Sequence, residues 1–284
     1  MNRNIQALIR ACERLKIDYA SHHGTGNLIS VRIKGIDYLF ANWTTPLNSQ
    51  SVVQLCQDKD YFYSFFQNVI EMPKTLSFLN PYCDEKYKEY LDHNTVFSII
   101  ESVESNFRYP VAVKKNRGSW GTNVFKANNR KELEKSILIV FDENSAAFDY
   151  VCLVQQFLDI DNEYRVIFLN GQYQFGYKKN IENAKYSGNI SPLHWEGAVA
   201  ELIDDATTNN LCKFCSPIFE ELMIPFCGLD IAEDTKGNLW LIEANSSPGF
   251  DHVIQDNEKY DVVGELYESI LKQLSENRNT SQKP

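Results

Sequence analysis

The sequence predicts an α+β protein, in which helices and β-hairpins follow one another without a regular βαβ repeat. Apolar residues recur at helical spacing over residues 3–16, which indicates an amphipathic helix at the start of the chain. Asn170-Gly171 separates two strand-like runs, and this dipeptide is typical of a two-residue hairpin turn. The segment 226–249, FCGLDIAEDTKGNLWLIEANSSPG, predicts a second hairpin with its turn at 234–238.

The remaining elements follow from the same two periodicities. The first short strands are separated by Gly24, Gly26 and Gly35, and a helix that begins near residue 58 ends before Met72-Pro73. Helices are expected at 3–16, 58–70, 129–140, 207–223 and 261–274. Strands are expected at 17–21, 28–33, 36–41, 109–115, 123–127, 151–158, 163–169 and 172–179, and in the 226–249 hairpin.

Composition excludes several classes of protein. The 284 residues carry a net charge of −10, which argues against a protein that binds nucleic acid by neutralising phosphates. The chain has no apolar run near the ~18 residues of a membrane span, and charged residues interrupt its N-terminal stripe, so we expect a cytoplasmic protein without a membrane partner. Seven scattered cysteines fit a reducing compartment, and Cys212 and Cys215 are expected to be buried thiols rather than zinc ligands.

The 226–249 hairpin is the most informative segment. If its strands pair about Lys236-Gly237, Asp230 lies directly opposite Glu243, and Asn245 shares the face of Glu243. Facing carboxylates repel, so we expect a cation to compensate for them. Carboxylate and amide oxygens suit Mg²⁺, especially together with nucleotide phosphates. The alternative is an exposed acidic hairpin. The expected Ala232/Leu241 pair argues against it, because both residues of this pair are small or apolar.

Two further segments carry charge in unusual places. Lys114 ends the apolar strand VAVKK, where a lysine needs an anionic partner, and the following GSWG could cover phosphates with its backbone N–H groups. An ordinary hairpin with a snorkelling lysine is the alternative. Glu163 and Arg165 share one face of a strand and could bind ribose hydroxyls and a phosphate or carboxylate, or simply each other. Lys178, Lys179 and Lys185 read as a solvated edge.

These segments, taken in order, resemble one family. They are AspLys at 58–59, YPVAVKKNRGSWG at 109–121, LVQQFL at 153–158, NEYRV at 162–166, GNI at 188–190, GLDI at 228–231 and LIEANSSPG at 241–249. Their order is similar to that of the ATP-grasp carboxylate–amine ligases, which include glutathione synthetase, D-alanine–D-alanine ligase, cyanophycin synthetase and the ribosomal-protein glutamate ligases. The resemblance implies an ATP-grasp domain at 57–275 with a lid-like subdomain at about 109–157. A short α/β pre-grasp segment at 1–56 precedes it, and a flexible tail at 276–284 follows.

The resemblance also implies roles for individual residues. Those expected to bind ATP are Lys59, Lys114, Gly118, Ser119, Trp120, Gly121, Gln155, Gln156, Phe157, Leu158 and Glu163. Those expected to hold Mg²⁺, or Mn²⁺ in its place, are Asp230, Glu243 and Asn245. Arg165 and Asn189 are expected at the phosphoryl-transfer centre. The chain departs from the family pattern at Gln156, Trp120 and Asn123, and it lacks the arginine that often precedes the asparagine at 189.

The resemblance implies an ADP-forming ligase that joins the carboxylate of an amino acid or short peptide to an amine acceptor through an acyl phosphate. None of the five histidines is assigned to catalysis, since they share no spacing. A non-catalytic ATP-binding regulator and a small-molecule kinase on the same fold are the alternatives, and a homodimer is left open.

Overall fold

A computed structural model describes residues 1–118, 123–185, 193, 195–257 and 261–276. Its helices are α1 (Arg3–Leu15), α2 (Gln50–Gln57), α3 (Lys59–Phe66), α4 (Val96–Asn106), α5 (Arg130–Phe141), α6 (Asp205–Glu221), α7 (Asp251–Asp256) and α8 (Val262–Glu276), with a 3₁₀ helix η1 at Glu85–Tyr90. Its strands are β1 (Tyr19–Ser21), β2 (Leu28–Ile33), β3 (Ile36–Ala41), β4 (Thr75–Leu79), β5 (Val111–Lys115), β6 (Val124–Ala127), β7 (Val151–Gln156), β8 (Ile160–Leu169), β9 (Gln172–Asn180), β10 (Val199–Leu202), β11 (Phe226–Asp234) and β12 (Leu239–Asn245).

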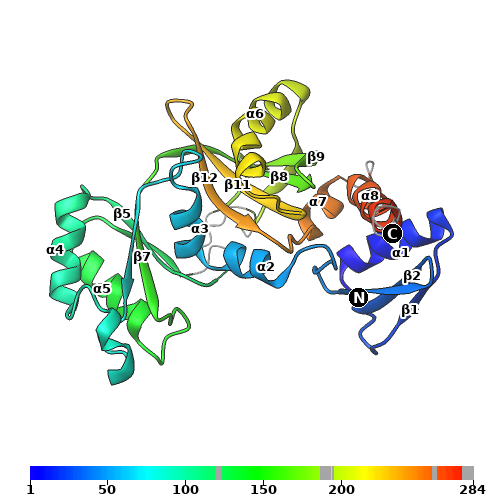
Figure 1. Cartoon of the computed structure of the whole chain (residues 1–284). Helices are drawn as coiled ribbons and strands as arrows, with labels where there is room; N and C mark the ends of the chain where they lie inside the picture. Colours follow the sequence, from blue (N-terminus) through cyan, green and yellow to red (C-terminus); the bar gives the residue numbers. More distant parts are fainter. Residues whose placement is uncertain (119–122, 186–192, 194, 258–260, 277–284) are drawn as a thin grey trace.

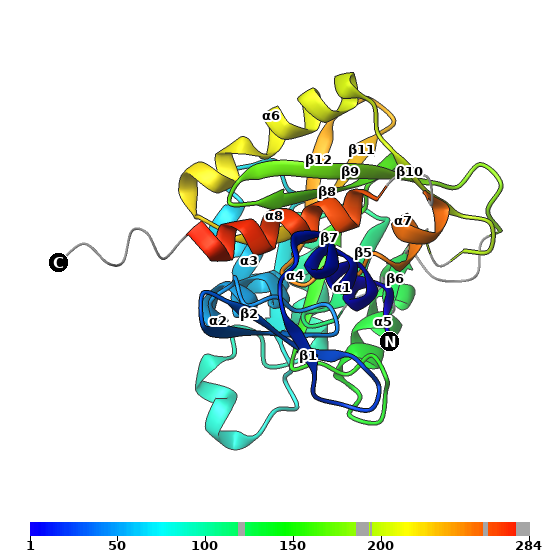
Figure 2. The ribbon, with the colours of Figure 1, turned by 90° about the vertical axis from the view of Figure 1, so that its right-hand side faces the viewer.

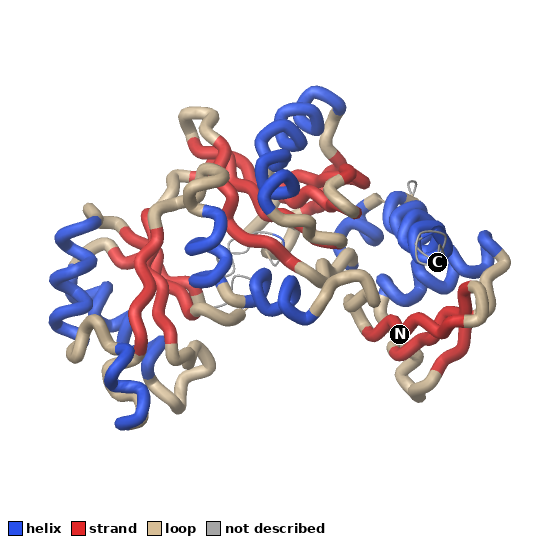
Figure 3. The backbone as a smooth tube through the Cα atoms, viewed as in Figure 1, coloured by secondary structure: helices blue, strands red, loops and turns tan. Residues whose placement is uncertain are grey.

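The strands form three antiparallel sheets, which lie one beside the next in Figures 1 and 3. The N-terminal sheet has the order β1-β2-β3. The five-stranded sheet, β10-β9-β8-β11-β12, is called the large sheet below, and the four-stranded sheet, β4-β7-β5-β6, is called the small sheet. The predicted α+β class is confirmed.

Most of the predicted elements are present, with shifts of one to four residues at their ends. Asn170 and Gly171 have φ of 48° and 71°, as the predicted hairpin turn between β8 and β9 requires. Asn123, which stands where glycine is frequent, also has a positive φ, of 61°. The elements not predicted from the sequence are α2, α4, α7, η1, β4 and β10, most of which are short.

Helices cover both faces of the large sheet, α3 and α6 on one face and α8 on part of the other. Alternate residues of β8, such as Tyr164, Val166 and Phe168, pack with α3 and α6. On the opposite face, Ile167 and Leu169 pack with α8. Figure 2 shows α6 and α8 on opposite sides of this sheet. The strand alternation therefore places Glu163 and Arg165 on the same face as Ile167 but beyond the part that α8 covers.

The small sheet follows the same rule. Val111 and Val113 of β5 pack against α4 and α5 in a separate apolar core, together with Cys152 and Val154 of β7. The alternate residues, which include Lys114, consequently face the other way, toward the large sheet.

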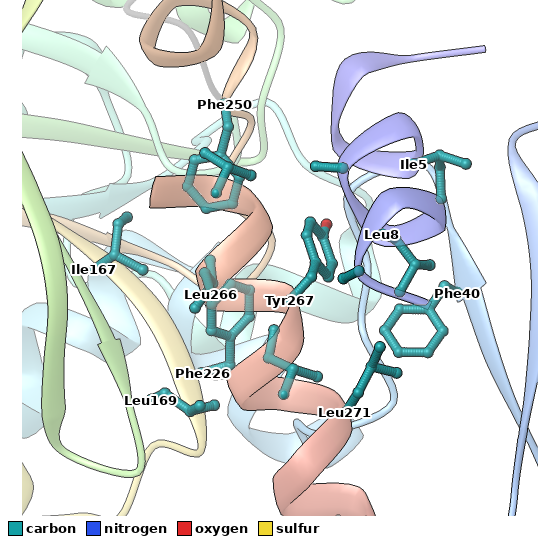
Figure 4. Packing of buried hydrophobic residues seen from close by; sticks show 14 of the residues in the cluster. Ile5, Leu8, Phe40, Ile167, Leu169, Phe226, Phe250, Leu266, Tyr267 and Leu271 are labelled. Carbon is teal, nitrogen blue, oxygen red and sulfur yellow. The ribbon is translucent and has the colours of Figure 1, made fainter. Parts of the chain in front are cut away.

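The N-terminal segment packs on the end of the chain. Figure 4 shows Ile5 and Leu8 of α1 beside Tyr267 and Leu271 of α8, in a core that also contains Phe40. This core continues to the α8 side of the large sheet. Within the described ranges, no helix has the length and apolar character needed to cross a membrane.

Candidate active site

Two adjoining cavities lie beside the large sheet, and the first of them lies between it and the small sheet. The first, of about 190 Å³, is lined by side chains of β5, β7, β8, β11 and β12 and by the segment that follows β7. The second, of about 690 Å³, lies beside it and reaches toward the N-terminal segment. The residues that line both cavities are Lys59, Gly118, Lys179, Asp230 and Glu243.

The first cavity brings together residues that are 184 positions apart in the chain. Those predicted from the sequence and found in its wall are Lys59, Lys114, Gly118, Gln155, Gln156, Phe157, Leu158, Glu163, Asp230 and Glu243. Gln156 is exposed, and its backbone N–H donates to the carbonyl of Lys74 at 2.8 Å. Ala112, Val124 and Ile160 complete an apolar side of the cavity. A flat apolar group and a group bearing anionic oxygens could therefore bind at opposite ends.

Lys114 is a buried cation without a carboxylate partner. Its side chain is 7% exposed, and its ammonium donates to Gln155 Oε1 at 2.9 Å. Gln155 in turn donates to Thr75 Oγ1 at 2.8 Å, which fixes the orientation of the amide. Burial first, and the charge of Lys59 second, lower the pKa of Lys114 to about 8. No described residue forms an ion pair with Lys114, so its ammonium is available to an incoming anion, and its contact with nucleotide phosphates stays a prediction.

Lys59 connects the two walls of the cleft. It is the first residue of α3, and its ammonium donates to the carbonyl of Gly118 at 2.6 Å. The same ammonium lies 3.5 Å from Glu243 Oε2 on β12 of the large sheet. Lys59 therefore adds a second positive charge beside Lys114.

On the large sheet, charged side chains of three neighbouring strands form a continuous network. Arg165 donates to both oxygens of Asp230, at 2.5 and 2.6 Å. Lys179 donates to Glu163 at 2.8 Å and lies 3.7 Å from Asp230. Burial raises the pKa of Asp230, but the charges of Arg165 and Lys179 outweigh burial and hold it below the usual value.

This network bears on three inferences from the sequence. Asp230 is neutralised by Arg165, so its facing position opposite Glu243 does not by itself require a metal ion. Glu163 and Arg165 pair with other residues and not with each other. Lys179 is 7% exposed and belongs to the site, so it is no part of a solvated edge.

The register of the hairpin is confirmed at one rung and shifted at the next. Asp230 pairs with Glu243, as predicted. A bulge follows, so that Ala232 faces Trp240 and not Leu241. A bulge places two consecutive residues against one on the partner strand, and here both Ile242 and Glu243 reach the first cavity. Ile242 was missed because strict alternation would have turned it away.

The second cavity contains the other predicted residues of the large sheet. Arg165 and Asn245 line it, and Asn245 Nδ2 donates to Glu243 Oε1 at 3.4 Å. Residues not predicted from the sequence that also line it are Trp43, Arg117, Tyr177, Asp251 and His252, together with the loop 246–249. The predicted Ser119, Trp120, Gly121 and Asn189 lie outside the described residues.

Comparison with known proteins identifies the family. A family model for the RimK-like ATP-grasp domain matches residues 87–270, which is more than half of the chain. The chain belongs to the RimK-like ATP-grasp family. The predicted family and fold are thereby confirmed. D-alanine–D-alanine ligase from Bacillus anthracis has the same fold, with a TM-score of 0.57 and 15% identity over 81% of this chain and 72% of that chain.

Two curated relatives of this ATP-grasp protein are ligases. The coenzyme gamma-F420-2:alpha-L-glutamate ligase of Methanocaldococcus jannaschii is 28% identical over 166 residues, or 56% of this chain. The alpha-aminoadipate–LysW ligase LysX of Sulfurisphaera tokodaii is 25% identical over 217 residues, or 74% of this chain. The matched region spans 50% and 66% of the lengths of these relatives, respectively.

ATP-grasp ligases use ATP and a divalent metal ion, and the oxygen donors of this chain fit such an ion. Glu243 and Asn245 lie two residues apart on β12, and Asp230 is directly across from Glu243. Two carboxylates and an amide oxygen are hard ligands, of the kind Mg²⁺ prefers. Among the described residues, no group of three His, Cys, Asp or Glu side chains is placed to hold a metal ion. A metal ion here would therefore need the amide of Asn245 and oxygens from substrate phosphates.

Proposed function

We propose that this protein is an ATP-dependent carboxylate–amine ligase, which forms an amide or peptide bond and releases ADP and phosphate. The observation that carries the proposal is the first cavity, where the unpaired buried ammonium of Lys114 faces a wall holding Asp230 and Glu243. An anionic ligand would give Lys114 the ionic partner that a buried charge requires and that no described residue supplies. Membership of the RimK-like ATP-grasp family supports ATP as that ligand.

The nucleotide follows from the chemistry of the cavity wall. We propose that adenine lies between the residues 155–158 and the apolar side chain of Ile242. Glu163, which has a free acceptor oxygen beside its bond to Lys179, would accept from ribose hydroxyls. Lys59 and Lys114 would bind the phosphates, with the loop 118–121 beside them.

Asp230, Glu243 and Asn245 would hold the metal ion, which would supply positive charge to offset that of the phosphates. Arg165 donates one hydrogen bond to each oxygen of Asp230, which leaves further lone pairs on both oxygens for a metal ion. Arg165 also lines the second cavity, where its guanidinium could bind a carboxylate or a phosphoryl group. Asn189 is proposed to act beside Arg165, on the resemblance alone.

The second cavity, which opens from the shared wall, is proposed to bind an amino acid or short peptide and the amine acceptor. A carboxylate oxygen of the substrate attacks the γ-phosphorus of ATP, and the bond to the β-phosphate oxygen breaks to give ADP and an acyl phosphate. The amine nitrogen then attacks the acyl carbon, phosphate leaves, and the nitrogen loses a proton. The protein contributes by positioning these groups and stabilising their charge.

A screen of ADP release tests this function. Amino acids and dipeptides would be offered singly and in pairs with Mg-ATP, and products identified by mass spectrometry. With the active pair, ¹⁸O in the substrate carboxylate should appear in the released phosphate. Label in AMP would contradict the acyl phosphate. ADP release without any amine would favour a kinase, and ATP binding without turnover on any pair would favour a regulatory protein.

A further inference from the structure

Asp251 has an unusual position in the charge balance of the second cavity. Four cations line this cavity, and each pairs with a carboxylate of the protein: Lys59 with Glu243, Arg117 with Asp58, Arg165 with Asp230, and Lys179 with Glu163. Three carboxylates line it, and two of them, Asp230 and Glu243, are in those pairs. Within the described part of the chain, the half-buried carboxylate of Asp251 has neither an ion pair nor a hydrogen bond.

Arg3 contacts the backbone of Asp251 but not its carboxylate. Arg3 donates to the backbone carbonyl of Asp251 at 3.1 Å and to the side-chain amide of Gln255 at 2.7 Å. Its guanidinium makes no ion pair with the Asp251 carboxylate within 4 Å. The unmet charge on the cavity wall is therefore negative, and it lies at the end of the loop that follows the proposed metal ligand Asn245.

The N-terminal segment holds this wall in place. Asn4 of α1 is fully buried; it donates to the carbonyl of Pro248 at 3.1 Å and accepts from the N–H of Phe250 at 3.0 Å. Asn48 donates to the carbonyl of Ser246 at 3.1 Å. The loop is thus fixed at both ends immediately before Asp251, so that little ordering entropy is lost when a ligand binds.

An aromatic side chain lines the same cavity. Trp43 also comes from the N-terminal segment, and its indole approaches Gly249 so closely that a Cβ there would lie 3.3 Å from Nε1. The indole N–H is buried and without a partner among the described residues. A half-buried carboxylate without a partner suits a primary ammonium group, whereas the indole N–H, a donor only, suits an oxygen atom of a ligand.

We propose that Asp251 forms the subsite that binds a primary ammonium group of the substrate, within a wall that the N-terminal segment fixes. The proposal deepens the ligase function above and rests on it for the identity of the ligand. The ammonium belongs either to the amino acid whose carboxylate is activated or to the amine acceptor, and the kinetic experiment below distinguishes these two sources.

The competing explanation is that Asp251 only stabilises the start of α7, since acidic residues favour the first turn of a helix. Asp205 is a matched control, because it is also the first residue of its helix, α6, but is exposed and lines neither cavity. The variants Asp251→Asn and Asp205→Asn keep the side-chain shape and remove the charge.

The kinetic experiment uses the substrate pair found by the ADP-release screen. We expect Asp251→Asn to raise KM for one amine-bearing substrate at least tenfold and to change KM for ATP less than twofold. The substrate whose KM rises is the source of the ammonium. Asp205→Asn should change neither value. Unchanged KM values in Asp251→Asn, or an equal rise for ATP, would overturn the subsite.

A binding experiment separates this inference from the ligase function. Ligand-observed NMR would compare the free and N-acetylated forms of each amino acid, with Mg²⁺ and a non-hydrolysable ATP analogue present. Wild-type protein should bind the free form at least tenfold more tightly, and Asp251→Asn should lose that preference. This result would stand even if no amide product forms. Equal binding of the two forms by the wild type, or no binding at all, would overturn the inference while leaving any observed ligation intact.

Discussion

The two walls of the cleft differ in whether their buried charges are paired. On the small sheet, Lys114 is buried without an ion pair, and its pKa falls to about 8. On the large sheet, Asp230 is equally buried, yet Arg165 and Lys179 surround it and lower its pKa. A buried charge costs several kcal/mol unless it is paired. Lys114 on the small sheet is therefore available to an anion from outside, whereas cations of the protein already compensate the charge of Asp230 on the large sheet.

The largest expected effect comes from removing the carboxylate of Asp230, which pairs with Arg165 and Lys179 on the large sheet. Asp230→Asn would leave the buried Lys179 and the partly exposed Arg165 with one carboxylate fewer between them, and we expect a loss of about 3 kcal/mol in the free energy of unfolding. Urea denaturation measures this loss. The double variant Asp230→Asn, Arg165→Met should recover a large part of it, because the unpaired guanidinium is removed with its partner. Equal losses in the single and double variants would show that the pair contributes little.

Removing the charge of Lys114 should have the opposite effect and raise the stability of the protein. Below pH 8 its amine is charged in both the folded and unfolded states, so the full cost of burial applies. Between pH 8 and its ordinary pKa near 10.5, the folded state loses the proton and the unfolded state keeps it, so stability rises with pH. We expect Lys114→Met to be more stable than wild type at pH 7 by on the order of 3 kcal/mol. That gap should shrink as pH rises.

Urea denaturation of both proteins at pH 7 and pH 9.5 checks this dependence, with Lys135→Met, on the exposed side of α5, as the control. For Lys114→Met we also expect the free energy of ATP binding, measured by calorimetry, to weaken by about 1.5–3 kcal/mol, because the charge-assisted contact between Lys114 and phosphate is lost. If Lys114→Met is less stable than wild type at pH 7 and binds ATP normally, Lys114 is not an unpaired cation that binds ATP.

The sequence predicted the residues of these walls better than their pairing. Strand alternation placed Asp230 opposite Glu243 and put Glu163 and Arg165 on one face, because these relations are local. It could not find the partner of Arg165, since β8 and β11 are 65 residues apart and nothing local fixes which strands become neighbours. The bulge that turns Ile242 into the cavity is likewise a tertiary feature.

The structural role of the N-terminal segment was harder to predict from the sequence than the residues of the two walls. The helix of α1 was predicted from its apolar spacing, but the role of Asn4 depends on a loop 244 residues away. A fully buried asparagine at one position of an apolar helix face is a signal that could have been followed, since buried polar groups require partners. Similarly, α4 and β4 belong to the small sheet and its cover, and their short apolar runs gave no clear period.

A smaller effect should follow from Glu163, at the edge of the paired wall. Glu163→Gln removes one of two carboxylates beside Lys179 but leaves Asp230 3.7 Å away. We expect a loss of about 1–2 kcal/mol in unfolding free energy, less than for Asp230→Asn, since the lysine keeps one partner. Glu201→Gln on β10, whose carboxylate is exposed, is the control for urea denaturation. A loss as large as that of Asp230→Asn would mean that Glu163 is the main partner of Lys179.

The smallest effect on stability is expected at Lys59, which joins the two walls. Its contact with Glu243 is 3.5 Å long, and both side chains keep some exposure, at 15% and 22%. Partly exposed pairs contribute about 0–1 kcal/mol, so Lys59→Met should lower the unfolding free energy by no more than that. Removing Lys59 also removes a positive charge that lowers the pKa of Lys114. The pH range over which stability rises should consequently move upward from pH 8, as urea denaturation across pH 7–10 would detect, with Lys213→Met on α6 as the control. A pH dependence identical to that of the wild type would show that the two ammonium groups do not interact, and that each meets an incoming phosphate independently.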